Sequence, residues 1–312
     1  MSIENRIREE LFETILGFPT DFDPMSPEGL PLYRMAPPLA PDPAVKVTEE
    51  TVPACGDAPA VKVYVFEPAE SDEVRPGLLY FHGGGYAGGH TLQSAETLYM
   101  LVKETGCVIV SPEYRLAPEN PYPAGLEDCY RTLEWFAGNA AALRVDLDRI
   151  AVTGCSSGGG MTIAVCLMAR DRKGPNICFQ MPAYPTMDDR LDTVSSHQIT
   201  YNRVLNRSSC ENIWNMYLGV GHEKREVPVY AAPGRAEDLK DMPPCYSFVG
   251  DLDPHRDETI AYISKLVSSG VPTGFTLYNG CYHGFEAIVP QAEVSREANR
   301  QMVEALKRAF QV

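Results

Sequence analysis

The chain contains 312 residues, of which 44% are hydrophobic and 22% are charged. This composition excludes a largely disordered protein, and the length suits one large domain with an insertion or two average domains. The formal net charge of −15 at pH 7 disfavours nucleic acid and anionic membrane surfaces as partners.

The nine cysteines favour a reducing environment. Their number is odd, no pair has CxxC spacing, and Cys107 and Cys166 lie in apolar runs, which indicates buried free thiols rather than disulfides or a zinc site. Residues 1–16 lack a signal-peptide core, and no uncharged apolar run approaches the roughly 20 residues of a membrane helix. We therefore expect a soluble, cytoplasmic protein without membrane insertion and without a bound metal.

The N-terminal region predicts one helix followed by an extended segment. Residues 4–16 mix charged and apolar positions at helical spacing. The apolar stripe consists of Ile3, Ile7, Leu11 and Ile15. Residues 17–60 are rich in proline, so this segment is expected to be extended and to wrap over another part of the protein.

Strand and helix patterns alternate from about residue 61 onward. The predicted strands lie at 61–66, 77–82, 107–111, 149–154, 176–181, 245–250 and 274–278. The first of them alternates like a strand with one exposed face, the next five are mostly apolar, as in strands buried on both faces, and 274–278 is the last predicted strand. The predicted helices lie at 93–105, 123–142, 159–172, 256–269 and 291–310. This order predicts an α/β fold with a mostly parallel central sheet flanked by helices.

Residues 184–235 interrupt the alternation. Polar and aromatic residues mix there, and the run at 208–221 predicts a short helix capped by Ser208 or Ser209. We interpret the stretch as an insertion that forms a helical cap, or lid, together with the N-terminal region. The predicted division is a catalytic core at 51–184 and 236–312 and a cap at 1–50 and 185–235.

The sharpest local signal is Gly-Cys-Ser-Ser-Gly at 154–158, which has the form G-x-S-x-G. A predicted strand runs into it and a predicted helix follows it, which is the order that a nucleophile elbow requires. The glycines suit a tight turn, and the helix N-terminus directs its dipole and free N–H groups toward the serine. We predict Ser156 as a catalytic nucleophile.

A second signal, His-Gly-Gly-Gly-Tyr at 82–86, directly follows a predicted strand. Glycines let backbone N–H groups approach a ligand closely, so this loop predicts an oxyanion hole. The predicted donors are the amides of Gly83, Gly84, Gly85 and Ser157. For His82 we expect a ring that braces the loop by hydrogen bonds rather than a catalytic group.

The base and the acid are expected after the nucleophile, in the order Ser, Asp or Glu, His. His283 follows the last predicted strand, where loops lie at the same sheet edge as the serine. His255 is the alternative base. It lies only two residues from the best candidate acid, a spacing that makes a separate base role awkward.

Three aspartates follow the predicted strand at 245–250. Asp253 precedes a proline and is therefore expected in an extended loop, which makes it the predicted acid. Asp251 stays an alternative. Asp257 is expected in the first turn of the next helix, where a carboxylate interacts favourably with the helix dipole.

These residues resemble the hormone-sensitive lipase family of α/β-hydrolases, in particular its bacterial-type carboxylesterases. The resemblance extends from about Leu78 to Phe285. It is carried by HGGGY at 82–86, EYRLAPENPYPAGLED at 113–128, GCSSGG at 154–159, VGDLDPHRDE at 249–258 and YHGFE at 282–286. It implies an α/β-hydrolase fold with a cap, and a catalytic triad of Ser156, Asp253 and His283.

The chain departs from the family pattern at three positions. Cys155 stands where Asp or Thr is common, and Ser157 stands where Ala is common. An oxyanion donor at 157 is retained, because only the backbone amide is required. His255 stands where an apolar or aromatic residue is more usual.

The resemblance implies hydrolysis of small carboxylic esters with short to medium acyl chains, through an acyl-enzyme and without a cofactor or metal. Tyr86, Trp214 and Tyr217 are predicted to line the substrate pocket, with a place in the core of the cap as the alternative.

Two alternative functions stay open: an amidase or peptidase with the same triad, and a non-catalytic receptor on the same fold, although the presence of His283 disfavours a receptor. The resemblance also allows a homodimer paired through a sheet edge.

Overall fold

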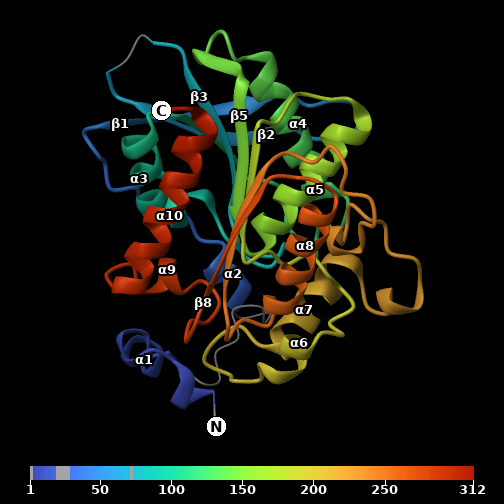
Figure 1. The fold of residues 1–312 in the computed structure, drawn as a ribbon. Coiled ribbons are helices and arrows are strands. Elements are labelled where there is room, and N and C mark those ends of the chain that lie inside the picture. The colour runs from blue at the N-terminus through green and yellow to red at the C-terminus, as the bar shows by residue number, and fades with distance from the viewer. Residues whose placement is uncertain (1–2, 19–28, 71–72) are drawn as a thin grey trace.

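The chain folds around one eight-stranded sheet (Figure 1). A computed structural model describes residues 3–18, 29–70 and 73–312. The strands are β1 (Val45–Val52), β2 (Val61–Pro68), β3 (Arg75–Phe81), β4 (Val108–Pro112), β5 (Val145–Cys155), β6 (Phe179–Ala183), β7 (Cys245–Gly250) and β8 (Thr273–Tyr278). Their order across the sheet is β1-β2-β4-β3-β5-β6-β7-β8. β2 is antiparallel to both neighbours and the pairs from β4 to β8 are parallel, which confirms the predicted fold class.

Each predicted strand corresponds to an observed one, with shifts at the ends, but the prediction misses β1. This strand lies in the proline-rich region that was expected to be merely extended. Only its two end residues, Val45 and Val52, are buried because it is an edge strand, so it lacks the apolar run of a buried strand. β1 also crosses the predicted boundary at residue 51, and the sheet therefore reaches further toward the N-terminus than predicted.

β2 is more buried than the predicted strand with one exposed face. Val63 and Val65 pack into the core on one side of the sheet, whereas Tyr64 and Phe66 pack into the core on the other side. Alternating side chains of a strand point to opposite faces, so burial of both sets shows that β2 is covered on both faces. The sequence does not reveal that both faces of β2 are covered, because the polar residues Lys62 and Glu67 lie near the ends of the strand.

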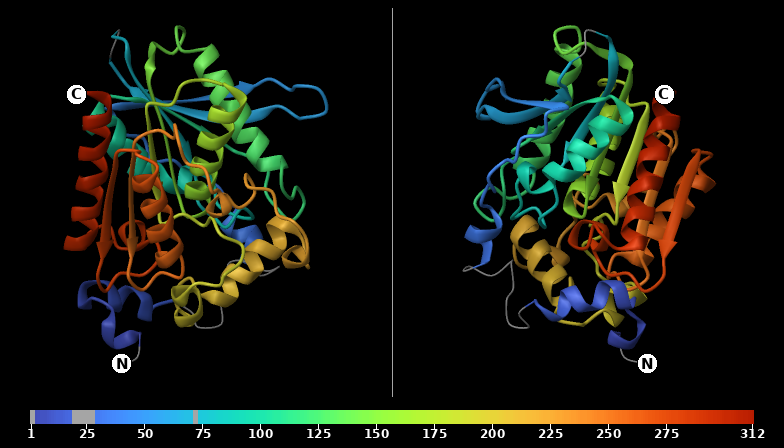
Figure 2. Two further views of the ribbon diagram at one scale, coloured as in Figure 1. Left: turned by 45° about the vertical axis from the view of Figure 1, so that its right-hand side comes forward. Right: turned by 90° about the vertical axis from the view of Figure 1, so that its left-hand side faces the viewer.

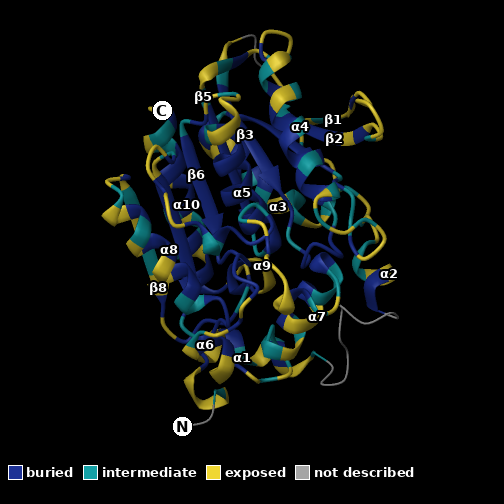
Figure 3. Cartoon of the chain, turned by 90° about the vertical axis from the view of Figure 1, so that its right-hand side faces the viewer, coloured by how far each residue is buried: buried dark blue, intermediate teal, exposed yellow. Residues whose placement is uncertain are grey.

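Helices cover both faces of the sheet (Figures 1 and 2). One face carries α3 (Ala95–Thr105) and α10 (Glu293–Phe310), and the other carries α4 (Ala124–Gly138), α5 (Ser157–Arg172) and α8 (Arg256–Ser268). Figure 3 shows buried strands between helices whose outer surfaces are exposed. The parallel strands β3, β4, β6 and β7 are thus buried on both sides, as their apolar runs require, whereas the edge strand β8 is buried only at Tyr278.

Three small helices lie at the end of the sheet where the parallel strands finish, the lower end in Figure 1. They are α1 (Glu9–Leu16), α6 (Val194–Gln198) and α7 (Arg207–Leu218). The short helices α2 (Gly29–Tyr33) and α9 (Phe285–Ile288) complete the α-helices of the described residues. The predicted apolar stripe of the N-terminal helix is confirmed at Leu11 and Ile15, which are both fully buried.

The helix α7 begins with a different cap from the one predicted. Asn206, and neither Ser208 nor Ser209, has the extended backbone of an N-cap, and its side chain accepts a hydrogen bond from the backbone N–H of Ser209. An asparagine oxygen satisfies a free N–H of the first turn as well as a serine oxygen does. The helix therefore starts at Arg207, one residue before the predicted run.

The N-terminal segment is attached to the loops that follow β7 and β8. Arg6 forms an ion pair with Asp251 at 2.7 Å, and the backbone N–H of Arg8 donates to the carbonyl oxygen of Gly280. The hydroxyl of Tyr282 donates to the carbonyl oxygen of Leu11 at 3.4 Å. Residues near the start of the chain thus hold two loops near its end.

All nine cysteines are free thiols. Cys55 is exposed and most of the others are buried, as their apolar surroundings in the sequence indicate. Among the helices of the described residues, none combines the length and the apolar character needed to cross a lipid bilayer.

Candidate active site

Ser156 lies at the turn between β5 and α5. The register sets Gly154 opposite Phe81 of β3 on one side and opposite Pro182 of β6 on the other, so the serine emerges between the loops that follow those strands. Its backbone has φ 56° and ψ −121°, a left-handed φ that a non-glycine residue adopts only with strain. α5 begins at the next residue, as a nucleophile elbow requires.

The turn requires glycine on both sides of the serine. A Cβ added at Gly154 would lie 2.5 Å from the carbonyl oxygen of Gly158 and 2.6 Å from that of Phe81. A Cβ added at Gly158 would overlap the carbonyl oxygen of Phe81 and lie 2.7 Å from that of His82. Because the neighbours are backbone atoms, no side-chain rotation relieves the overlap.

Gly158→Ala is expected to destabilise the fold by about 3 kcal/mol, since the added methyl group displaces either the turn or the chain after β3. Gly138→Ala at the end of α4 is the matched control, because nothing lies within 4 Å of its added Cβ. Thermal unfolding followed by circular dichroism measures both variants. Equal Tm values for the two variants would show that the turn tolerates a side chain at 158.

Loops from the neighbouring strands β7 and β8 bring a carboxylate and an imidazole to the serine. His283 follows β8, and its Nε2 atom lies 2.9 Å from Oγ of Ser156. Its Nδ1 atom lies 2.7 Å from Oδ2 of Asp253, which follows β7. The structure thus brings the three predicted triad residues into one hydrogen-bonded chain, although 127 positions separate the serine from the histidine.

Asp253 is fully buried, and its surroundings favour the ionised form. Oδ1 accepts a hydrogen bond from the backbone N–H of His255 at 2.8 Å. Burial alone would raise the pKa of Asp253, but the imidazoles of His283 and His255 and these hydrogen bonds hold the pKa below its ordinary value. A carboxylate in this place keeps a proton on Nδ1 of His283 and leaves Nε2 free to accept one.

The alternative acids and the alternative base have other partners. Asp251 is paired with Arg6, and Asp257 is paired with its neighbour in α8. His255 directs Nε2 to the hydroxyl of Thr186 at 3.0 Å. Of the acids and bases in the described part of the chain, His283 is the one in direct hydrogen-bond contact with the serine hydroxyl.

The glycine loop after β3 lies against the serine. A Cβ added at Gly83 would be 3.5 Å from Cβ of Ser156. Gly84 and Gly85 have φ of 126° and 60°, values that favour glycine. Ser157 opens α5, so its amide is one of the unpaired N–H groups of a helix N-terminus. An oxyanion-hole role for these four residues stays a prediction.

His82 braces this loop, in agreement with its expected role. Its buried ring stacks on Tyr114 with centroids 4.3 Å apart, and its Nδ1 atom lies 2.8 Å from the carbonyl oxygen of Gly83. The hydroxyl of Tyr114 donates to the carbonyl oxygen of His82 at 2.7 Å. Burial lowers the pKa of His82, which favours a neutral ring that holds the loop in place.

The three predicted pocket residues form one buried aromatic cluster. Tyr86 stacks on Tyr217 of α7 with centroids 4.0 Å apart, and Trp214 packs beside both rings. The hydroxyl of Tyr86 donates to the carbonyl oxygen of Thr186 at 2.6 Å. The cluster joins the glycine loop to the insertion. This buried position agrees with the alternative prediction, which places the three residues in the core of the cap. A role in lining the substrate pocket stays a prediction.

Sequence reasoning misses a buried carboxyl group beside the site. Oε1 of Glu286 in α9 accepts a hydrogen bond from the hydroxyl of Tyr184 at 2.5 Å, and the ring of Tyr184 packs edge-on against His283. Burial raises the pKa of Glu286 to about 7. The motif YHGFE contains this glutamate, but its tyrosine partner lies 102 positions away, so only the fold reveals the pair.

Among the described residues, one group of side chains lies close enough together to hold a metal ion. It consists of Asp253, His255 and His283, whose ligand atoms lie within 4.8 Å of one another. The hydrogen bond between Asp253 and His283 already occupies two of these atoms, and Nε2 of His255 faces a hydroxyl. We therefore assign none of them to a metal, and the absence of a cofactor stays a prediction.

Comparisons with known proteins agree with this arrangement. The profile of a family described as having the alpha/beta hydrolase fold matches residues 78–287. Esterase LipI of Mycobacterium tuberculosis is 36% identical over 73% of this chain and 71% of its own length, and carboxylesterase NlhH of the same species is 33% identical over 86% and 84%. The solved structure of a bacterial heroin esterase superposes with a TM-score of 0.90 at 32% identity, over 99% of both chains. The chain therefore belongs to the hormone-sensitive lipase family of α/β-hydrolases.

Proposed function

We propose that this protein is a serine carboxylesterase in which Ser156 is the nucleophile, His283 the general base and Asp253 the residue that orients the base. One observation carries the proposal: Nε2 of His283 lies 2.9 Å from the serine oxygen while its Nδ1 atom lies 2.7 Å from the buried carboxylate. The named relatives are esterases, which supports ester hydrolysis as the activity.

In the first half of the reaction, Nε2 of His283 takes the hydroxyl proton while Oγ of Ser156 attacks the ester carbonyl carbon. The negative charge that develops on the carbonyl oxygen is stabilised by amides of Gly83, Gly84 or Gly85 and of Ser157. The C–O bond to the alcohol then breaks, and the alcohol leaves with the proton from His283. An acyl group remains on Ser156.

In the second half, His283 accepts a proton from water as the water oxygen attacks the acyl carbon. The C–Oγ bond then breaks, Oγ recovers a proton from His283, and the carboxylic acid leaves.

We propose that small esters with short to medium acyl chains are the substrates. The cap assigned to residues 1–50 and 185–235 is the region proposed to limit the acyl length, since α1, α6 and α7 lie at the same end of the sheet as the serine.

An ester and an amide with the same acyl and leaving-group skeletons test this function against the amidase alternative. We expect hydrolysis of a p-nitrophenyl ester with kcat/KM at least about 10³-fold above that of the matched p-nitroanilide. A fluorophosphonate probe is expected to label Ser156, as identified by mass spectrometry of the labelled peptide. Equal rates on both substrates would favour an amidase, and failure of both labelling and hydrolysis would favour a receptor.

Two further properties stay proposals. The edge strand β8 offers unpaired backbone groups for a homodimer that continues the sheet, and light scattering measures the mass of the particle in solution. A cytoplasmic location is proposed from the free cysteines.

A further inference from the structure

A second polar group, the hydroxyl of Thr186, lies beside the hydroxyl of Ser156. Oγ1 of Thr186 lies 3.4 Å from Oγ of Ser156. Both backbone polar groups of Thr186 are hydrogen-bonded. Its N–H donates to the carbonyl oxygen of Ser156 at 2.9 Å, and its carbonyl oxygen accepts a hydrogen bond from the hydroxyl of Tyr86. The hydroxyl is fully buried, so its position beside the serine is fixed.

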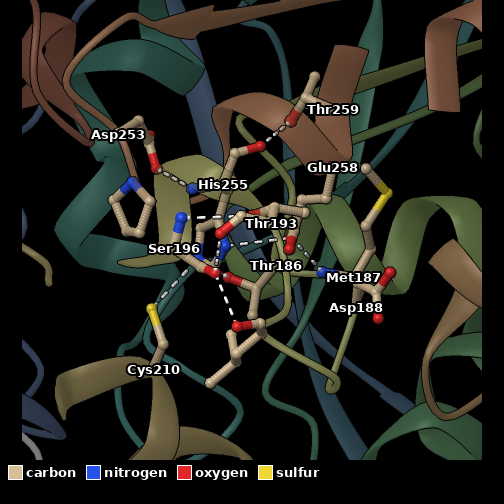
Figure 4. Close-up of polar contacts among 12 residues, drawn as sticks. Thr186, Met187, Asp188, Thr193, Ser196, Cys210, Asp253, His255, Glu258 and Thr259 are labelled. Carbon is tan, nitrogen blue, oxygen red and sulfur yellow. Dashed lines mark hydrogen bonds and ion pairs between the residues drawn. The ribbon is translucent and has the colours of Figure 1, made fainter. Parts of the chain in front are cut away.

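Behind Thr186 lies a buried imidazole with its own carboxylate (Figure 4). Nε2 of His255 is 3.0 Å from the threonine hydroxyl, and Nδ1 is 3.0 Å from Oε1 of Glu258. This second contact is an ion pair without hydrogen-bond alignment, and Oε1 also accepts the backbone N–H of Met187 at 3.1 Å. Two His–carboxylate pairs thus reach the serine hydroxyl: His283 with Asp253 is in direct contact, and His255 with Glu258 acts through the hydroxyl of Thr186.

The groups that face His255 come from several elements. They are Glu258 from α8, Cys210 from α7, Asp253 and His283 from the loops after β7 and β8, and Asp188 near Glu258. Burial disfavours a charge on His255, but the carboxylate of Glu258 outweighs this effect and holds the pKa of His255 well above its ordinary value. Burial raises the pKa of the Cys210 thiol, so this neighbour is uncharged.

A protonated His255 fixes the direction of each hydrogen bond in the chain. Its Nε2–H then donates to Oγ1 of Thr186, which leaves the threonine proton to donate to Oγ of Ser156. The serine proton in turn donates to His283. A neutral His255 with its proton on Nδ1 would instead accept from Thr186 and turn that proton away from the serine.

We propose that Thr186 is a hydrogen-bond donor to the serine oxygen that accelerates release of the acyl group, and that His255 and Glu258 are positioning residues that orient it. This inference rests on the proposed function. In the acyl-enzyme, Oγ is an ester oxygen and a weak acceptor. When the C–Oγ bond breaks, the electron pair moves onto Oγ, and a donor at this place stabilises it until His283 returns the proton.

Thr186→Val tests the donor, because valine keeps the shape and removes the hydroxyl. With a p-nitrophenyl ester, whose good leaving group is expected to make deacylation rate-limiting, kcat is expected to fall about tenfold and KM to fall with it, while kcat/KM changes less than about twofold. A burst of p-nitrophenol close to one equivalent per labelled site is expected. Thr186→Ser is the matched control, since it keeps the donor and is expected to recover most of kcat.

His255→Leu tests the positioning role, because it keeps the backbone N–H that binds Asp253 and removes the imidazole. Its kcat is expected to fall about threefold, and the double variant with Thr186→Val is expected to be no slower than Thr186→Val alone. Additive losses, or a Thr186→Ser as impaired as Thr186→Val, would overturn the inference.

Fluorophosphonate labelling separates this inference from the proposed function. Thr186→Val is expected to be labelled at Ser156 at the wild-type extent, which shows a folded site and supplies the active-site count. Labelling with unchanged kcat and no burst would reject the role of Thr186 and leave the triad intact. A wild-type protein without labelling and without ester hydrolysis would reject the proposed function itself.

Discussion

Ser156→Ala is expected to lower kcat for a p-nitrophenyl ester by at least about 10⁴-fold, because no other group takes the place of the attacking oxygen. The remaining rate would come from binding and oxyanion stabilisation alone. The fold is expected to survive, since alanine removes one hydroxyl from a side chain that is only half-buried. Steady-state kinetics and circular dichroism of the same preparation measure both properties.

Ser208→Ala is the control for this variant. Ser208 is an exposed residue of α7, and its loss is expected to leave kcat and the Tm within error of the wild type. The assignment of the nucleophile would be refuted if the Ser156→Ala protein still hydrolyses the ester and the fluorophosphonate probe labels another residue.

The second large effect is expected for Asp253→Asn, which should lower kcat by about 10⁴-fold with little change in KM. An amide at this place is neutral and can donate to Nδ1 of His283, which favours the tautomer with its proton on Nε2. That tautomer cannot accept the proton of Ser156. Because the carboxylate is fully buried near the imidazoles of His283 and His255, its loss also removes the charge that stabilises protonated His283.

Asp251→Asn provides a matched control from the same loop. This residue pairs with Arg6 and accepts the backbone N–H of Gly280 at 2.6 Å, so its loss loosens the N-terminal attachment without changing the triad. We expect a reduction in kcat of less than about tenfold. A larger effect for Asp251→Asn than for Asp253→Asn would identify Asp251, the alternative acid, as the residue that orients the base.

The strongest sequence predictions depend on local patterns. The elbow around Ser156 follows from a strand, a tight turn and a helix that are adjacent in the chain, and the strand at 245–250 is observed at the same residues. The sequence does not predict β1, because an edge strand with a largely solvent-facing middle lacks the apolar run that marks buried strands. Local patterns therefore predict elements with buried faces better than elements at the margin of a sheet.

Contacts between distant segments lie beyond such reasoning. The sequence suggests His255 as an alternative base because it is a histidine near the best acid, whereas its partners in the structure are a threonine 69 positions away and a glutamate on the next helical turn. The Tyr184–Glu286 pair spans 102 positions. The pairing of β5 with β6 brings Thr186 next to the serine. Because this contact depends on the pairing of strands, the sequence around Thr186 does not indicate it.

The attachment of the N-terminal segment has a consequence for how the molecule is assembled. Leu11 leaves the ribosome 271 residues before Tyr282, whose loop holds the N-terminal segment. The nascent chain must therefore carry Leu11 and Ile15 undocked until residues 279–283 have been made. Docking closes a loop of 271 residues that contains the whole sheet, so it is expected to follow formation of the sheet.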